Sequence, residues 1–304
     1  MSLSKQRLWF RTLMALSAIG AAPLALMGCG TSAPASTPTS APTPQPTAQT
    51  WPNILAVAHR GGAALAPENT LGAFANALKI GVDMVECDVH LSKDGELVVM
   101  HDPDLSRTTD GNGFIYQMSL VDIQKLNAAA KFKATTWPAE RVPTLGEVLD
   151  LVKGKVKIQI EIKVEKFLGR YTGIEQKVID AVNARDMVDD VIIISFDFPT
   201  IADLKKLDPR FKTGALMNTT TLSLNAKRPH DDYVAEVLQQ TGADYIMPSS
   251  AGVSDLLVNA VHAAGLKIGV WTVDSAGEMR RMAEWGVDAI TTNKPDELKQ
   301  VLGR

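Results

Sequence analysis

Three carboxylates stand where they could hold a metal ion between them. Glu86 and Asp88 are two residues apart in the apolar run Met84–His90, a candidate strand, so their side chains share one face. Glu161 lies in a second candidate strand, Val156–Ile162. Buried carboxylates repel one another and persist most readily around a cation, while ion pairs with lysine or arginine are the structural alternative. Oxygen ligands alone favour Mg²⁺ or Ca²⁺ over Zn²⁺, which prefers histidine or cysteine.

Cationic groups and a histidine accompany the carboxylates. His59 and Arg60 follow the candidate strand Ile54–Ala58 and precede two glycines, which suits proton transfer beside an anion-binding guanidinium. The alternative is a histidine that caps the strand and an arginine in a surface ion pair. Lys163 continues the alternation of Glu161 on the same strand face. Arg60 and Lys163 would offset the negative charge of an anionic substrate at the metal.

Four further residues are weaker candidates. His101 ends the run Leu97–Met100, which we expect to form a hairpin with the strand before it. Glu68 could reach the site, or it could simply belong to the turn ahead of the first helix. Trp271 could wall a substrate pocket or be plain core. His90 keeps the phase of the carboxylates, but it sits where the strand runs into the hairpin.

The elements that must position these residues alternate between short apolar runs and helical segments. The candidate strands are 54–58, 84–90, 156–162, 191–196, 213–217, 245–248, 268–273 and 289–291, and the helical segments include 70–80, 174–184, 201–207, 231–240, 253–264, 276–285 and 295–301. Strands that are apolar on both faces belong in a parallel sheet covered by helices. Eight such units predict an α/β fold, the (β/α)8 TIM barrel, with a small insertion over 103–143 after strand two. A doubly wound open sheet is the alternative.

The N-terminal 52 residues differ in composition from the rest. Residues 1–28 have a basic start and an apolar stretch typical of a signal peptide, and they end before Cys29 in a sequence that resembles a bacterial lipobox. Residues 29–52 are rich in Ser, Thr and Pro and are expected to be a tether. We therefore expect export, a lipidated Cys29 and anchoring at the extracytoplasmic face of a bacterial membrane. An ordinary secretory signal is the alternative. The domain would then span 53–304.

Composition limits the possible partners. The net charge is −3, which gives no general electrostatic attraction for nucleic acid. The chain has two cysteines, so a lipidated Cys29 would leave Cys87 without a disulfide partner. Nothing in the sequence indicates an obligate protein partner.

Taken in order along the chain, the motifs resemble those of the glycerophosphodiester phosphodiesterase family. The matching stretches are His59-Arg60-Gly61, Pro67-Glu68-Asn69-Thr70, Val85-Glu86-Cys87-Asp88-Val89, Lys93-Asp94-Gly95, Val99-Met100-His101-Asp102, Arg107-Thr108-Thr109 with Gly111, Pro143-Thr144-Leu145 with Glu147, Ile160-Glu161-Ile162-Lys163, Ser195-Phe196 and Val270-Trp271-Thr272-Val273. Each motif alone is weak evidence, whereas ten in register over about 53–302 are strong.

The resemblance implies a (β/α)8 barrel that hydrolyses glycerophosphodiesters to an alcohol and glycerol 3-phosphate. It implies Glu86, Asp88 and Glu161 as ligands of one divalent cation, and His59 and His101 as the acid–base pair. It also implies Arg60 and Lys163 on the phosphate. The chain departs from the family at Asp274, where Asn is common, and at Thr292-Asn293, where Thr-Asp is common. We expect these departures to leave the metal and histidine set untouched.

Two other functions remain open at this point. Phospholipase C-like and sphingomyelinase D-like barrels also use paired histidines, and a lipid-tethered enzyme would have intact phospholipid nearby. A surface lipoprotein that only captures a phosphorylated solute is the non-enzymatic alternative. Binding alone requires neither two histidines nor three clustered carboxylates, so the sequence favours an enzyme.

Overall fold

The computed structural model describes residues 50–133, 137–164 and 169–304. The predicted signal peptide and nearly all of the predicted tether, residues 1–49, lie outside the described residues. Within the described part of the chain, no helix is both long and apolar enough to cross a membrane.

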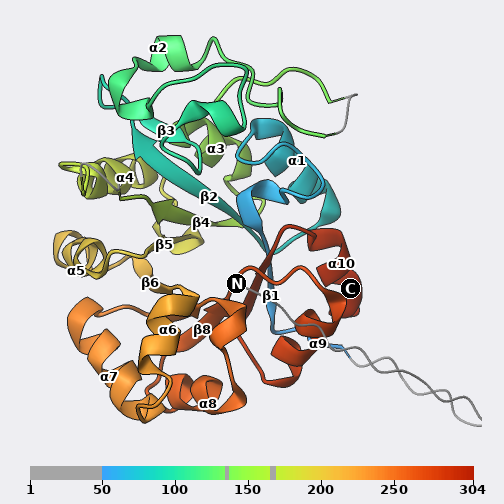
Figure 1. Ribbon diagram of the computed structural model, residues 1–304, viewed down its shortest axis with the longest axis vertical. Coiled ribbons are helices and arrows are strands. Elements are labelled where there is room, and N and C mark those ends of the chain that lie inside the picture. The colour runs from blue at the N-terminus through green and yellow to red at the C-terminus, as the bar shows by residue number, and fades with distance from the viewer. Residues whose placement is uncertain (1–49, 134–136, 165–168) are drawn as a thin grey trace, which may run out of the picture. The chain divides into compact units, whose positions relative to one another are not determined.

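Eight parallel strands close into a barrel (Figure 1). They are β1 (Leu55–Ala58), β2 (Met84–Leu91), β4 (Lys157–Ile162), β5 (Val191–Ser195), β6 (Lys212–Met217), β7 (Tyr245–Pro248), β8 (Lys267–Val270) and β9 (Ala289–Thr292). The first strand pairs with both the second and the last, which closes the sheet and excludes the open alternative. The predicted (β/α)8 fold is confirmed.

Helices surround the barrel, as expected for a parallel sheet that is apolar on both faces. The described helices are α1 (Leu71–Ile80), α2 (Leu120–Ile123), α3 (Leu145–Val152), α4 (Ile174–Asn183), α5 (Phe198–Leu207), α6 (Thr219–Asn225), α7 (His230–Thr241), α8 (Asp255–Ala263), α9 (Ala276–Glu284) and α10 (Pro295–Val301). Many begin at a capping side chain. Thr144 and Glu147, for example, form a reciprocal capping box at the start of α3.

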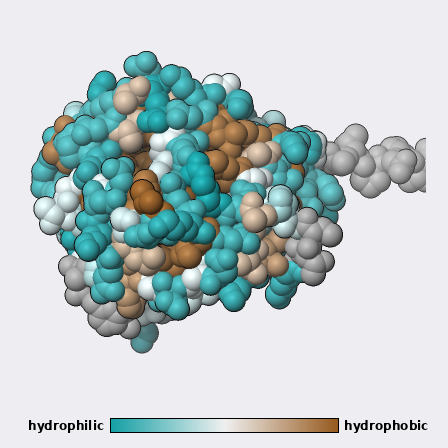
Figure 2. Space-filling view, turned by 90° about the horizontal axis from the view of Figure 1, so that it is seen from above, coloured by the Kyte–Doolittle hydropathy of each residue, from teal (hydrophilic) through white to brown (hydrophobic). Residues whose placement is uncertain are grey.

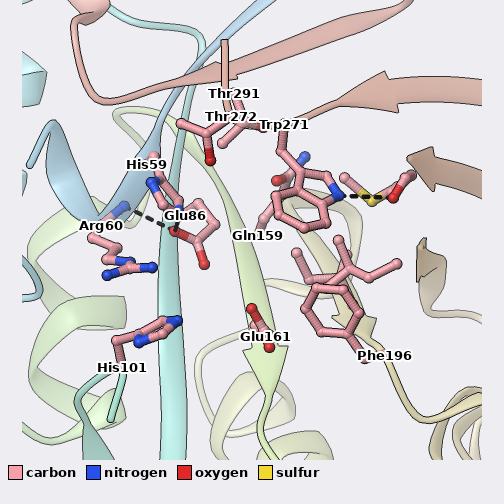
Figure 3. Close-up of a pocket in the computed structure, with 13 residues that line it drawn as sticks. His59, Arg60, Glu86, His101, Gln159, Glu161, Phe196, Trp271, Thr272 and Thr291 are labelled. Atoms are coloured by element: carbon pink, nitrogen blue, oxygen red, sulfur yellow. Dashed lines mark hydrogen bonds and ion pairs between the residues drawn. The ribbon is translucent and has the colours of Figure 1, made fainter. Parts of the chain in front are cut away.

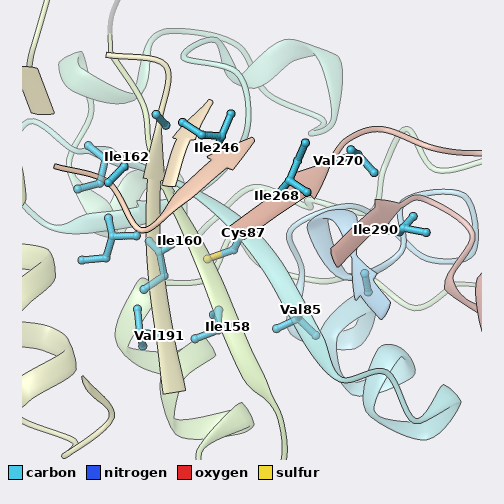
Figure 4. Packing of buried hydrophobic residues seen from close by; sticks show 14 of the residues in the cluster. Val85, Cys87, Ile158, Ile160, Ile162, Val191, Ile246, Ile268, Val270 and Ile290 are labelled. Atoms are coloured by element: carbon cyan, nitrogen blue, oxygen red, sulfur yellow. The ribbon is translucent and has the colours of Figure 1, made fainter. Parts of the chain in front are cut away.

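The outer faces of the strands and the inner faces of the helices form the main core. Figure 4 shows Cys87 on this outer side of the barrel, among Val85, Ile158 and Ile160. This is the orientation that strand alternation predicts when Glu86 and Asp88 face inward. Burial of each such aliphatic side chain stabilises the fold by about 1.5–3 kcal/mol.

The predicted hairpin and insertion follow β2. Strand β3 (Leu97–Val99) runs antiparallel to the end of β2, and the excursion beyond it has its own small core. The residues of that core are Val98, Met100, Leu105, Ile115, Ile123, Ala128 and Val142. Figure 2, seen from the side on which this excursion lies in Figure 1, shows a largely hydrophilic face with apolar residues in small separate groups. The small core named above holds the excursion together.

Candidate active site

Strand register brings the three carboxylates together. Asp88 on β2 pairs with Glu161 on β4, and Glu86 lies one inward-facing position earlier. One oxygen from each of the three side chains lies within 4.8 Å of the others, and all three residues are buried. This is a donor set that a hard divalent cation prefers.

Charge at the carboxylates is only partly balanced by the protein. Lys163 Nζ lies 2.8 Å from a carboxylate oxygen of Glu161 and 3.3 Å from one of Asp88. Two of the three carboxylates therefore form ion pairs with a lysine, which was the structural alternative to a metal site. Burial would raise the pKa of Asp88, but Lys163 and Arg60 hold it below its ordinary value. Burial and the charge of Asp88 raise the pKa of Glu86 well above its ordinary value. Burial likewise raises the pKa of Glu161 to about 7. The excess negative charge at the two glutamates fits a bound cation.

A tight turn after β1 presents Arg60 to the carboxylates. The backbone N–H of Arg60 donates to Glu86 Oε2 (2.8 Å), and its Nε lies 3.5 Å from Asp88 Oδ2. Arg60 has a left-handed backbone with φ 52°, which is uncommon for a residue with a side chain and is typical of functional turns. Asn69, with φ 59°, supports the turn by donating its backbone N–H to the carbonyl of Arg60.

Asn293 fixes the orientation of His59. His59 Nδ1 lies 2.7 Å from Asn293 Oδ1, and Asn293 Nδ2 donates to Asp274 Oδ2 (2.7 Å). Because a carboxylate only accepts, the Asn293 amide must direct its oxygen to His59, so Nδ1 carries the proton. His59 Nε2 is then unprotonated. It lies 4.0 Å from Glu86 Oε2, which is beyond hydrogen-bond reach.

This contact corrects one expectation. The departures from the family at Asp274 and Asn293 were expected to leave the histidines untouched, and that was wrong. Asn293 is hydrogen-bonded directly to His59. Asp274 accepts hydrogen bonds from both the side-chain amide and the backbone N–H of Asn293. His59 and Asn293 are 234 residues apart, so strand periodicity gave no signal of the contact.

His101 has a different partner. Its Nδ1 lies 2.6 Å from Asp102 Oδ1, and Arg107 binds the other oxygen of that carboxylate. Arg107 also donates two hydrogen bonds to Glu68, which in turn accepts from Arg60 (2.9 Å). Glu68 thus ties the two arginines together and does not line the cavity.

His90 supports the hairpin behind His101. Its Nε2 lies 3.1 Å from the backbone carbonyl oxygen of His101, and its Nδ1 lies 3.0 Å from the hydroxyl of Tyr171. His90 is buried and does not line the cavity. Because both of its ring nitrogens contact these structural partners, His90 has a structural position rather than a catalytic one.

A cavity joins these groups to an apolar wall. Figure 3 shows His59, Arg60 and His101 on one side, with Phe196 and Trp271 on the other. The two aromatic rings meet edge to face at 5.3 Å, and Trp271 Nε1 donates to the carbonyl of Met247 (2.8 Å). The cavity is also lined by Glu86, Gln159, Glu161, Ile194, Leu216, Met247, Thr272 and Thr291. Trp271 is thus part of the pocket wall, and half-exposed Phe196, which was not a candidate from sequence, joins it.

The fold and this geometry define a class of enzyme. In parallel barrels, catalytic groups lie at the carboxyl ends of the strands, where these residues lie. A carboxylate trio that could hold a cation, beside two histidines and two basic side chains, suits metal-assisted hydrolysis of an anionic ester.

Comparison with known proteins agrees with this class. The model of the glycerophosphoryl diester phosphodiesterase family matches residues 59–297, and the chain belongs to this family. Its members are phosphoric diester hydrolases. A glycerophosphodiester phosphodiesterase of Caldanaerobacter subterraneus is 37% identical over 251 residues, covering 80% of this chain and 96% of the relative.

Solved structures give the same result. A glycerophosphoryl diester phosphodiesterase from Silicibacter pomeroyi, described as putative, is similar with a TM-score of 0.73 and 26% identity, covering 83% of this chain and 94% of that one. A phosphodiesterase from Oleispira antarctica, solved in complex with the product sn-glycerol-3-phosphate, has a TM-score of 0.71 and 25% identity, covering 84% and 98%.

Proposed function

We propose that this protein hydrolyses glycerophosphodiesters to an alcohol and sn-glycerol 3-phosphate. The observation that carries the proposal is the buried trio Glu86, Asp88 and Glu161 between two histidines that have different hydrogen-bond partners. Membership of the family and the product named for the Oleispira structure support the substrate class.

The trio would hold one divalent cation, Ca²⁺ or Mg²⁺. When bound, such an ion polarises the phosphoryl group and stabilises the negative charge that develops on it. Arg60 and Lys163 would neutralise and orient the phosphate. Burial would lower the pKa of Lys163, but Glu161 and Asp88 raise it above its ordinary value, so the ammonium stays charged.

His59 would act as the base. Its Nε2 is the unprotonated ring nitrogen, and burial together with the charge of Arg60 lowers the pKa of His59 to about 4. The ring is therefore neutral at pH 7 and can take the proton of the attacking hydroxyl, whether that hydroxyl is water or belongs to the substrate's glycerol.

His101 would act as the acid. Burial lowers the pKa of His101, while Asp88 and the hydrogen bond to Asp102 favour its protonated form. The negative charge of a bound phosphodiester would also favour the protonated form of His101. His101 would donate its proton to the alkoxide as the phosphorus–oxygen bond breaks. An alkoxide is a poor leaving group at neutral pH, and an acid at this position is worth about 10²–10⁴ in rate.

A coupled assay for glycerol 3-phosphate tests the proposal. We expect release from a panel of glycerophosphodiesters with Ca²⁺ or Mg²⁺, none with chelator, and much less from intact phospholipid. His101→Ala and Glu86→Ala should lose at least about 100-fold in kcat/KM. His262→Ala is the control, because His262 pairs with Asp288 on the outside of the barrel. Wild-type rates in the first two variants would contradict the assignment. Preferential cleavage of phospholipid would favour a phospholipase.

We further propose that the enzyme is exported and anchored through a lipidated Cys29. The support is the sequence of residues 1–28 and the Cys29 that follows. Labelling cells with a radioactive fatty acid should mark the wild-type protein and not Cys29→Ser, and the variant should appear in the soluble fraction. A labelled or membrane-bound Cys29→Ser protein would exclude this anchor.

A further inference from the structure

Charges are unevenly distributed along the axis of the barrel. The surrounding helices begin at the mouth of the cavity, where the strands end, and they finish at the opposite end, which we call the bottom face. The first turns of these helices carry acidic residues, among them Glu147, Glu175, Asp231, Asp255, Glu278 and Asp296. The last turns carry basic residues, among them Lys79, Lys205, Lys206, Arg281 and Lys299. Because the helices share one direction, these charges add up to an acidic mouth and a more basic bottom face.

Three exposed lysines add to the positive charge of the bottom face. Lys157, Lys212 and Lys267 are the first residues of β4, β6 and β8, and each is exposed while the strand residues after it are buried. Lys157 Nζ lies 3.4 Å from the backbone carbonyl oxygen of Asp189, and Lys267 Nζ lies 6.0 Å from the centre of the Tyr245 ring. Neither contact neutralises the ammonium group, so both charges are available to an anionic partner.

Several aspartates of the bottom face are already paired within the protein. Asp83, Asp244 and Asp288 each directly precede a strand and accept a backbone N–H from a neighbouring strand, at 2.7, 2.9 and 2.9 Å. Their side-chain partners are Arg304, Lys205 with Lys212, and His262. The domain as a whole is acidic, because three of the basic residues and none of the acidic residues precede residue 50. The bottom face is therefore the end of an acidic domain at which lysine charge is concentrated.

The chain enters the domain on this same face. Trp51 donates its backbone N–H to the carbonyl of Leu302, just beyond the end of α10, and Leu55 donates to the carbonyl of Asp288, just before β9. Residues 30–49 separate Cys29 from Thr50, and a chain of that length spans at most about 70 Å. Such a length would let either end of the barrel reach the membrane that holds Cys29, so the distribution of charge decides between them.

We infer that the bottom face lies against an anionic lipid bilayer and that the mouth of the cavity opens away from it. The inference rests on the proposed lipid anchor and deepens the proposed function. Water-soluble diesters would reach the cavity directly, whereas phospholipids of the anchoring bilayer would not. Each lysine near an anionic surface strengthens binding about fivefold, and salt weakens the attraction. The charge therefore orients an anchored protein but does not hold an unanchored one at physiological ionic strength.

Vesicle binding at low ionic strength tests the inference independently of catalysis. Chain 29–304 with Cys29→Ser should bind phosphatidylcholine vesicles that contain about one third phosphatidylglycerol, and should not bind pure phosphatidylcholine. Lys157→Gln combined with Lys267→Gln should weaken this binding at least about tenfold. The matched control is Lys131→Gln combined with Lys133→Gln, which removes the same charge from exposed lysines of the excursion and should change binding less than about twofold. Equal losses in the two pairs, or equal binding to both kinds of vesicle, would overturn the inference.

A fluorescent label at either end of α8 reports the orientation directly. Ala251 lies ahead of this helix on the mouth side and Ala264 follows it on the bottom face, and both are exposed. Cys87 is buried, so a thiol-reactive bimane would label only Ala251→Cys or Ala264→Cys. Phosphatidylcholine with a nitroxide on its head group should quench the label at 264 more strongly than the label at 251 on anionic vesicles. Equal or reversed quenching would overturn the inference. A wild type that releases no glycerol 3-phosphate would overturn the proposed function alone, because neither vesicle measurement requires turnover.

Discussion

Asp274 does not line the cavity, yet it acts on His59 through Asn293. With Asp274→Asn, the new amide could donate to Asn293, which could then turn its own NH₂ toward His59. The proton of the His59 ring would then move from Nδ1 to Nε2, and Nε2 could no longer act as the base. We expect kcat to fall about 10- to 100-fold with little change in the melting temperature, measured by steady-state kinetics and calorimetry.

A second histidine–aspartate contact provides the control for that variant. His262 Nε2 lies 3.0 Å from Asp288 on the outside of the barrel. Asp288→Asn removes the same charge without touching His59 and should leave kcat within about twofold. An equal loss of kcat in both variants would mean that Asp274 matters only for folding.

Arg107 links the acid to the phosphate-binding turn. It binds Asp102, the partner of His101, and donates to Glu68, the partner of Arg60. We expect Arg107→Gln to lower kcat about tenfold, because His101 loses its fixed orientation. Arg141→Gln is the matched control. Arg141 has a similar exposure, 45% against 46%, and a glutamate partner remote from the site. Equal kcat in the two variants would exclude this role for Arg107.

Strands were easier to predict than the contacts between loops. Strand β7 was predicted at its observed bounds, because a continuous apolar run records burial on both faces. Strand β8 ends at Val270, whereas 268–273 was expected, because Trp271 turns to wall the cavity and makes only an isolated bridge to Ser249. A local pattern cannot distinguish an apolar residue in a strand from one in a pocket wall.

The residues of the candidate site likewise fall into those that the sequence could predict and those that it could not. The carboxylates could be predicted because their spacing of two fixes a common strand face. The roles of Asn293 and Arg107 could not, because each depends on a contact between distant segments. Gln159 shares the phase of Glu161, but the sequence could not show that its amide is buried without a hydrogen-bond partner among the described residues.

The turn that carries His59 and Arg60 depends on Gly61. Its φ is 82°, and a Cβ there would lie 2.8 Å from Cβ of Ala73 on α1. Gly61→Ala should therefore displace the turn and lower both stability and kcat/KM. Gly81→Ala isolates the backbone effect, because Gly81 has a φ of 79° and open space around it. We expect that control to lose about 1 kcal/mol of unfolding free energy with full activity. Equal kcat/KM in the two variants would contradict the steric argument.

Removal of the metal should make the stability of the whole protein depend on pH. The pKa of Glu161 rises from 4.5 to about 7 on burial, and that of Glu86 rises as well. At these two glutamates the metal-free folded state therefore binds protons more tightly than the unfolded state. Their contribution to stability is fully present below about pH 4.5 and is lost as the pH rises through 7. His59 and His90 act in the opposite sense, because burial lowers the pKa of each to about 4. Asp88, with a lowered pKa, contributes little between pH 5.5 and 8.

Thermal unfolding in chelator of the wild type and of Glu161→Gln isolates the glutamate. Between pH 5.5 and pH 8 the wild type should lose a few degrees more in melting temperature than the variant, since the group that titrates is gone from the variant. Added Ca²⁺ should remove most of this excess, because the cation replaces the protons. An equal change in the two proteins would contradict the charge imbalance at the site.

His101, Asp102 and Arg107 come from the excursion after β2, whose small core is separate from that of the barrel. Small cooperative units open more readily than large ones. The acid would then be lost by local opening while the barrel stays folded, so the working enzyme is less robust than its fold. In a denaturant titration, activity should disappear before the circular dichroism of the barrel changes. Amides of α2, which contributes Ile123 to the small core, should exchange with deuterium faster than those of β4 and β5.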